Sequence, residues 1–345
     1  MKSFASDNYS GVHPKIMEAI LAANSTHQIS YGDDEITEQT NKLFREKFGN
    51  VEVLYVFNGT GANVVSLKCA LLPFQSIICT DSAHILVDEC GAPTQSIGSS
   101  IISIPSQNGK LTPEMILPHL ATIGNVHHTQ PKVISISQST ELGTIYTVEE
   151  LKSLSKFAHL HNLYLHVDGA RLSNAVSSLG CTLKEATADC DIDIMSFGGT
   201  KNGLMMGEAI LIFNEELKKN APFFHKQSAQ LYSKNRFLSA QFKALLEDDL
   251  WFQLASHANS MAKKLAEMSS QIEEVKITQK VEANGVFVTI PPYAVEPLRA
   301  IYPFYNWNET TNELRWMCSF DTTEEEVFSF VDKLKELIHS YKNNH

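Results

Sequence analysis

The sequence contains few cysteines, and no two of them form a Cys-x-x-Cys pair. The six are scattered, at positions 69, 79, 90, 181, 190 and 318 of a 345-residue chain. A zinc knuckle is therefore not expected, and no other metal site is predicted. Most of these cysteines lie in apolar stretches, where a reduced thiol acts as a small core side chain. This usage favours the cytoplasm.

Long apolar stretches and excess positive charge are also lacking. The first eight residues do not form the apolar segment of a secretory signal, and no stretch has the length and apolarity of a membrane span. Lysine and arginine total 28 against 39 aspartates and glutamates, for a formal net charge of −11. A nucleic acid or an anionic membrane is not an expected partner, because binding to either favours a basic surface.

What is present is the composition of a globular protein, with 43% hydrophobic and 19% charged residues. The length exceeds what one hydrophobic core usually serves. We expect an N-terminal arm over 1–35, a large domain over 36–245 and a smaller C-terminal domain over 246–345.

Alternating strand and helix patterns organise the chain. Short apolar stretches predict strands at 52–57, 76–80, 100–104, 133–137, 163–167, 192–196 and 209–213. Helices are predicted at 14–23, 35–48 and 62–72, with further helix starts at Thr112 and Thr147. This alternation predicts an α/β fold, with a mostly parallel central sheet and helices on both faces. A helix over 241–270, strands at 286–290 and 314–318 and a helix at 323–342 predict a smaller α+β domain.

Two predicted strands end at residues whose side chains could take part in catalysis or ligand binding. One runs into Asp168-Gly-Ala-Arg171, and another into Phe197-Gly-Gly-Thr-Lys201. The carboxyl ends of parallel strands border the crevice in which α/β proteins bind ligands, so Asp168 and Lys201 are predicted to lie at one edge. From the local sequence alone, Asp168 could instead cap the next helix, and Lys201 could be a solvated loop residue.

An acid and a lysine at one edge suit pyridoxal 5'-phosphate (PLP). The amine can form a Schiff base with the aldehyde, and the carboxylate can keep the pyridine nitrogen protonated. The turn Asn58-Gly-Thr-Gly61 could bind the phosphate, since it leads into a helix with free N–H groups; a tight turn without a ligand is the alternative. No Gly-x-Gly-x-x-Gly motif opens the first strand–helix unit, which argues against a Rossmann dehydrogenase.

Three more residues are candidates for the same crevice. His84 follows the strand at 76–80, where an imidazole could lie on a cofactor ring and move protons; an ordinary loop histidine is the alternative. Arg171 lies three residues after Asp168, and Arg315 stands in an apolar strand. A guanidinium there needs an anionic partner, either a substrate carboxylate or a carboxylate of the protein.

These motifs together resemble those of the low-specificity L-threonine aldolases, which have the aspartate-aminotransferase-like fold (fold type I of the PLP-dependent transferases). The resemblance covers nearly the whole chain. It rests on Ser6-Asp7, Tyr31-Gly-Asp-Asp34, Asn58-Gly-Thr-Gly-Ala-Asn63, His84 with Glu89 and Gly91, His166-Val-Asp-Gly-Ala-Arg171, Ser196-Phe-Gly-Gly-Thr-Lys201 and Arg315. It implies an aldolase that cleaves L-threonine, L-allo-threonine and related β-hydroxy-α-amino acids to glycine and an aldehyde.

The resemblance also implies roles for single residues. Lys201, Asp168 and His84 would be catalytic and would bind PLP, together with Gly59, Thr60, Gly61, Arg171 and Thr200. The substrate would be bound by Ser6, Tyr31, Arg171 and Arg315. A homotetramer, a dimer of dimers with shared sites, is implied, and Lys234 or Arg236 would reach the phosphate of a neighbouring subunit.

One segment departs from the family pattern. Many members have Glu-Asn-Thr-His after the strand at 133–137, whereas this chain has Gln138-Ser-Thr-Glu141. The base at the β-hydroxyl is therefore open between His84 and Glu141, and the departure resembles a branch that includes phenylserine-aldolase-like members. The rival hypotheses are a PLP-dependent β-eliminating lyase of the tryptophanase type, an aminotransferase, and a protein that binds PLP without turnover.

Overall fold

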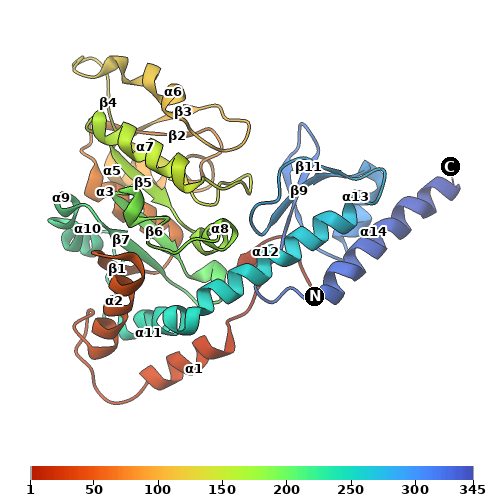
Figure 1. The fold of residues 1–345 in the computed structure, drawn as a ribbon, viewed down its shortest axis with the longest axis horizontal. Coiled ribbons are helices and arrows are strands. Elements are labelled where there is room, and N and C mark those ends of the chain that lie inside the picture. Colours follow the sequence, from red (N-terminus) through yellow and green to blue (C-terminus); the bar gives the residue numbers. More distant parts are fainter. Residues whose placement is uncertain (1, 345) are drawn as a thin grey trace.

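The computed structural model describes residues 2–344 and contains two lobes, each built on its own sheet (Figure 1). The larger lobe has a seven-stranded sheet of order β1-β7-β6-β5-β4-β2-β3. Its strands are β1 (Glu52–Val56), β2 (Gln75–Thr80), β3 (Ser100–Ile104), β4 (Gln130–Ser137), β5 (Tyr164–Asp168), β6 (Ile194–Gly198) and β7 (Glu208–Ile212). Only β7 runs antiparallel to its neighbours, so the predicted mostly parallel sheet is confirmed.

Helices cover both faces of this sheet. They are α1 (Pro14–Ala23), α2 (Glu35–Phe48), α3 (Gly59–Ala70), α4 (His84–Val87), α5 (Ala92–Ile97), α6 (Pro113–Ile116), α7 (Val148–Leu160), α8 (Leu172–Leu179), α9 (Glu215–Lys218), α10 (Ala221–Gln227) and α11 (Arg236–Leu246). Successive strand residues point to opposite faces. Thus Ile77 of β2 packs in the core beneath α3, and Ile78 packs in the core that includes α7 and α8.

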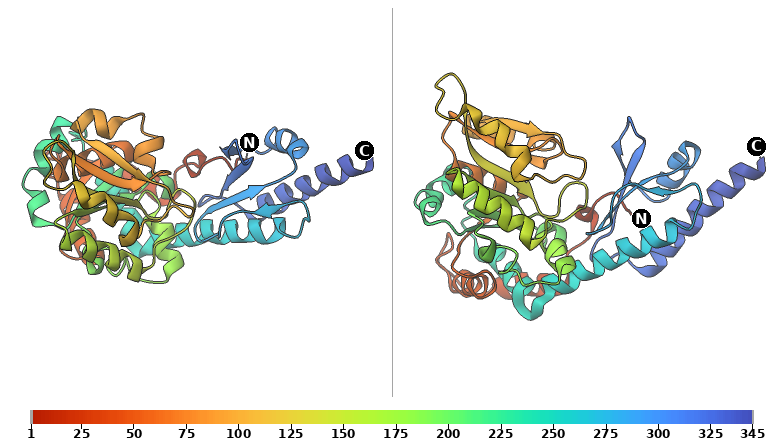
Figure 2. Two further views of the ribbon diagram at one scale, coloured as in Figure 1. Left: turned by 90° about the horizontal axis from the view of Figure 1, so that it is seen from above. Right: turned by 45° about the horizontal axis from the view of Figure 1, so that its top comes forward.

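The smaller lobe has a four-stranded antiparallel sheet of order β10-β11-β9-β8. Its strands are β8 (Lys276–Ile277), β9 (Gly285–Thr289), β10 (Tyr305–Asn308) and β11 (Glu313–Met317), and its helices are α12 (Leu250–Ser269), α13 (Pro292–Arg299) and α14 (Glu324–Asn344). The N-terminal segment joins this lobe, because Phe4 is buried in its core and bonds Pro303 and Met317 through the backbone. Figure 2 shows α14 extending away from the larger lobe.

Two predicted elements need correction. The helix expected over 241–270 is two helices, α11 and α12, because Asp248 and Asp249 have φ values of 51° and 52°, which cannot continue a right-handed helix. The segment Gly59–Gly61, expected as a turn, is the first turn of α3. Asn58 caps this helix by accepting a hydrogen bond from the Gly61 N–H.

The helix α12 takes part in both hydrophobic cores. Leu250 and Leu254 pack in the core of the larger lobe, and Met261 and Leu265 pack in that of the smaller one. The division at 35/36 and 245/246 stays a prediction. No helix within residues 2–344 combines the length and apolarity needed to cross a membrane.

Candidate active site

A cavity lies at the carboxyl ends of the parallel strands. Its lining residues come from five separate segments: Gly59, Asn63, His84, Glu89, Ser137, Ser139, Glu141, Asp168, Ala170, Arg171 and Lys201. Asp168 and Lys201 therefore share one cavity, as predicted from the strand ends. The structure also brings four other predicted residues to it, namely His84, Glu141, Arg171 and Gly59.

The backbone that leads to Lys201 is closely packed against neighbouring residues. It lies in a short 3-10 turn, η4 (Thr200–Asn202), just after β6. A Cβ on Gly198 would lie 2.2 Å from the Ala170 carbonyl oxygen, and one on Gly199 would lie 2.4 Å from Leu204, so both positions need glycine. Burial and the positive charge of Arg171 lower the pKa of Lys201. A larger fraction of its amine is then neutral and nucleophilic.

Asp168 is held in its ionised form. Although burial opposes ionisation, hydrogen bonds from Asn63 Nδ2 at 2.8 Å and from the Ala170 N–H at 3.0 Å lower the pKa of Asp168. The positive charge of Lys201 acts in the same direction. Asp168 does not cap helix α8, whose first turn receives no side-chain cap. A buried, ionised carboxylate is therefore aimed at the cavity that also holds the lysine.

A chain of hydrogen bonds links Asp168 to His84. Asn63 Nδ2 also donates to Glu89 Oε1 at 2.8 Å, and the same oxygen lies 3.0 Å from His84 Nδ1. The hydrogen bond to Glu89 raises the pKa of His84, outweighing the effect of burial. His84, Glu89 and Asp168 offer ligand atoms within 4.8 Å of one another. These hydrogen bonds account for the cluster without a cation.

Glu141 approaches the cavity from the loop after β4. Its Oε1 accepts hydrogen bonds from Ser137 Oγ at 2.5 Å and from the His84 N–H at 2.9 Å. Burial raises the pKa of Glu141 despite these donors. Glu141 thus contacts the backbone of the other candidate base, His84.

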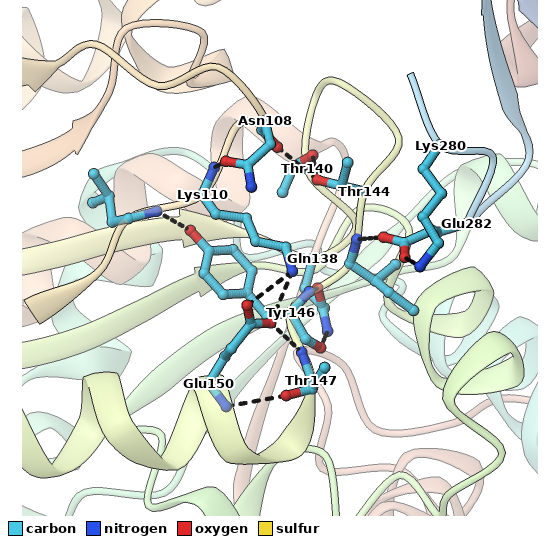
Figure 3. A network of polar contacts seen from close by, with 12 residues as sticks. Asn108, Lys110, Gln138, Thr140, Thr144, Tyr146, Thr147, Glu150, Lys280 and Glu282 are labelled. Carbon is cyan, nitrogen blue, oxygen red and sulfur yellow. Dashed lines mark hydrogen bonds and ion pairs between the residues drawn. The ribbon is translucent and has the colours of Figure 1, made fainter. Parts of the chain in front are cut away.

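The loop that carries Glu141 is braced on several sides (Figure 3). Gln138 and Tyr146 exchange two hydrogen bonds, of 2.8 and 2.9 Å, across the loop, and Thr140 Oγ1 lies 2.7 Å from Thr144 Oγ1. Glu282 of the smaller lobe accepts a hydrogen bond from the Ile145 N–H at 2.9 Å. This bracing holds Glu141 in place from both lobes.

The two arginines differ in their partners. Arg171 forms a buried ion pair with Asp7, through Nε and Nη2 at 2.7 and 2.8 Å. Arg315 lines an adjoining cavity with Glu141, Arg171 and Phe287. Among residues 2–344 it forms no ion pair, and its buried Nε has no hydrogen-bond partner. Arg315 is therefore the cation with free capacity for an anionic ligand.

A further carboxyl group supports the lysine turn. Glu208 lies at the start of β7, and its Oε2 accepts a hydrogen bond from the Gly199 N–H at 2.8 Å. Burial raises the pKa of Glu208 to about 7. Since β7 runs antiparallel to β6, its first residue lies at the edge where β6 ends.

A separate cavity of 490 Å³ lies between α2, the segment at 181–184 and the start of α12. Its Lys47 is paired with Asp249, and its Lys184 is paired with Asp189. Both lysines that line it are thus already paired with acids, so the cavity around Lys201 is the better candidate for an active site.

Comparison with known proteins agrees with this geometry. Residues 3–291 match the family model described as beta-eliminating lyase. A low specificity L-threonine aldolase from Pseudomonas aeruginosa is 42% identical over 94% of this chain and 95% of its own length. One from another Pseudomonas strain is 43% identical over the same shares. The chain belongs to the low-specificity L-threonine aldolase family.

The fold of this family member is also that of a solved relative. The structure of a Leishmania major threonine aldolase superposes with a TM-score of 0.93 at 32% identity, covering 98% of this chain and 100% of that one. The predicted family and its fold type I architecture are both confirmed.

Several predicted site residues do not line the cavity of this single chain. The Ser6 hydroxyl accepts the Asn8 N–H and lines another cavity near the N-terminus. Thr60 and Gly61 lie behind Gly59 in the first turn of α3, and the Thr200 hydroxyl bonds the backbone of Gly207.

Tyr31, Lys234 and Arg236 lie on a different part of the surface. Tyr31 is 49% exposed and packs against Lys226, whose Nζ lies 4.9 Å from the ring centre. Lys234 and Arg236 line a cavity of 420 Å³ with the segment at 26–30. In this single chain none of these three residues lines the cavity around Lys201.

Sequence reasoning gave no role to Asp7, Asn63 or Glu208. Asp7 and Asn63 stand inside recognised motifs, and Asn63 lies one helical turn after the glycine at position 59, on the same side of α3. That spacing was the available signal. For Glu208, the signal was a carboxyl group at the start of an otherwise apolar strand.

Proposed function

We propose that this family member uses PLP to cleave L-threonine, L-allo-threonine and related β-hydroxy-α-amino acids to glycine and an aldehyde. The observation that carries the proposal is the shared cavity of Lys201 and Asp168, which adjoins the unpaired guanidinium of Arg315. A lyase of this kind needs an amine, an anion for a pyridinium and a cation for a carboxylate.

The residues present fit PLP. Lys201 would attach the cofactor, Asp168 would pair with its ring nitrogen, and His84 would lie on the ring. The N–H groups at the start of α3 would bind the phosphate, since space beside Gly59 is free of other atoms within 4 Å. Bound there, PLP would supply an electron sink for the bond that breaks at Cα.

The substrate carboxylate would bind to Arg315, with Arg171 beside it. A bidentate guanidinium contact fixes the orientation of the amino acid and hence selects which bond at Cα is broken. His84 would accept the β-hydroxyl proton at Nε2, because its Nδ1 is already bonded to Glu89. Glu141 is the second candidate, favoured by its place in the same wall and its raised pKa.

A shared site between subunits would explain the remaining predicted residues. We propose a homotetramer, a dimer of dimers, in which Tyr31, Lys234 and Arg236 complete the site of a neighbour. Mixing inactive Lys201→Ala with inactive Arg236→Ala protein, under conditions that exchange subunits, should restore about a quarter of wild-type activity. If the mixture stays inactive despite exchange, each chain completes its own site.

Product analysis of the PLP-loaded protein tests the proposal. L-threonine, L-allo-threonine and L-phenylserine should each give glycine and an aldehyde. Pyruvate or another keto acid with ammonia would indicate β-elimination, and keto acid formed only with an amino acceptor would indicate transamination. Lys201→Ala should lose both the visible absorbance of the attached cofactor and turnover. Retention of both would contradict the role of Lys201, and binding without any turnover would indicate a non-catalytic protein.

A further inference from the structure

Arg315 lies in the middle of the small sheet. Its register partners are Tyr305 on β10 and Phe287 on β9, so these three side chains stand in one row on one face. The guanidinium is partly buried, and burial together with the like charge of Arg171 lowers the pKa of Arg315 to about 10. An unpaired cation in such a place needs another source of stabilisation.

Aromatic rings supply that stabilisation. Arg315 Cζ lies 5.0 Å from the ring centre of Trp307 and 5.8 Å from that of Tyr305. A cation within about 6 Å of an aromatic face is attracted by the ring quadrupole. Trp307 packs edge-on against Phe287, with ring centres 5.3 Å apart, and the Tyr305 hydroxyl lies 2.7 Å from the Tyr9 hydroxyl. Each ring is thus held against Arg315 by a second aromatic residue, Phe287 for Trp307 and Tyr9 for Tyr305.

We infer that Trp307 and Tyr305 are positioning residues, which hold the guanidinium of Arg315 ready for the carboxylate of an amino acid. Their rings attract the cation but carry no formal negative charge. An acidic side chain in their place would compete with the incoming carboxylate, as Asp7 does at Arg171. The inference rests on the proposed function, since it takes Arg315 as the carboxylate ligand.

The test compares Trp307→Leu with Trp307→Phe, which keeps an aromatic face. Phe328→Leu is the matched control, because Phe328 packs under Lys264 at 5.0 Å on the same lobe and lies outside the cavities around Lys201 and Arg315. Trp307→Leu should raise KM for L-threonine about tenfold with kcat within about twofold. Glycine affinity, measured by calorimetry on the PLP-loaded protein, should fall by the same factor. Trp307→Phe should recover most of the loss, and Phe328→Leu should behave as wild type.

Two results would overturn the inference. In one, Trp307→Leu leaves glycine affinity unchanged; in the other, Trp307→Phe loses as much affinity as Trp307→Leu, which would assign Trp307 a packing role alone. If Trp307→Leu does not fold by circular dichroism, Tyr305→Leu takes its place, because Tyr305 is 41% exposed. Arg315→Leu separates the two proposals: unchanged glycine affinity there would refute Arg315 as the carboxylate ligand.

Discussion

Asp7 and Arg171 lie 164 residues apart in the chain and form a two-pronged buried ion pair. Asn284 adds a hydrogen bond to Asp7 Oδ2 at 3.0 Å, so the N-terminal segment, the active-site strand end and the smaller lobe meet at one carboxylate. The pair fixes the direction of Arg171 and partly offsets its charge. It leaves Arg315 as the stronger attractor of anions in the neighbouring cavity.

The first prediction concerns stability and pH. Burial opposes ionisation, but the charge of Arg171 lowers the pKa of Asp7 from 3.8 to about 2. A carboxyl group whose pKa is lowered by folding stabilises the protein at pH values above its ordinary pKa. This stabilisation is lost as pH falls from about 4 to about 2. Asp7→Asn should therefore cost about 3–5 kcal/mol at pH 7, and the difference from wild type should shrink by about 2 kcal/mol towards pH 2.

Urea unfolding at several pH values measures this difference. Asp189→Asn is the control, since Asp189 forms an exposed pair with Lys184. That variant should lose less than about 1 kcal/mol at any pH. A constant penalty for Asp7→Asn across the whole range would show that the carboxylate charge is unimportant.

The second prediction concerns Asn63, whose amide donates to both Asp168 and Glu89. Asn63→Leu removes both hydrogen bonds, so the pKa of Asp168 should rise and its hold on a pyridinium should weaken. We expect kcat to fall about tenfold to a hundredfold. Asn174→Leu is the control, because Asn174 is an equally buried amide paired with Asn259. An equal loss of kcat in both variants would refute a specific role.

The third prediction separates the two candidate bases. If His84 accepts the proton, activity falls as pH drops through its raised pKa. Glu89→Gln removes the main cause of that shift, so the acid limb should move to lower pH. Glu141→Gln should leave the limb in place, and His84→Asn should reduce kcat about 10²- to 10⁴-fold. Loss of the limb in Glu141→Gln alone would transfer the role to Glu141.

The fourth prediction concerns Glu208. Burial raises its pKa from 4.5 to about 7, so folding is opposed by its ionisation and stability falls as pH rises from about 4.5 to about 7. Glu208→Gln should be more stable than wild type at pH 8, by at most about 3 kcal/mol, and nearly equal to it at pH 4. Glu216→Gln is the control, since Glu216 is exposed and pairs with Lys219. A Glu208→Gln variant less stable than wild type at pH 8 would contradict the predicted direction of the stability change.

The sequence predicted the seven strands of the larger sheet because apolar stretches bounded by turn residues are distinctive. It also placed Asp168 and Lys201 at one edge, since parallel strands share their carboxyl ends. It missed β10, whose stretch Tyr305–Asn308 alternates aromatic and amide residues and is largely exposed. The contacts of its two aromatic rings with Arg315 depend on how β10 pairs with β11, which no local pattern shows.

Local sequence patterns could not predict which charged residues form ion pairs with each other. Arg171 had two open interpretations, and the choice depended on Asp7, which reaches it only through folding of the N-terminal segment onto the smaller lobe. The break in the helix expected over 241–270 was hidden for a similar reason. Two aspartates fit a polar helix surface, and their left-handed conformation goes with a tertiary contact, the ion pair of Asp249 with Lys47 of α2.

The course of α12 limits how the molecule can be divided. One end of this helix supplies apolar side chains to the first core and the other end supplies them to the second. A cut within α12 would expose an apolar helix face on each fragment, and each fragment would be poorly soluble on its own. A split version of the protein should therefore be divided elsewhere, for example at the exposed turn near Gly124.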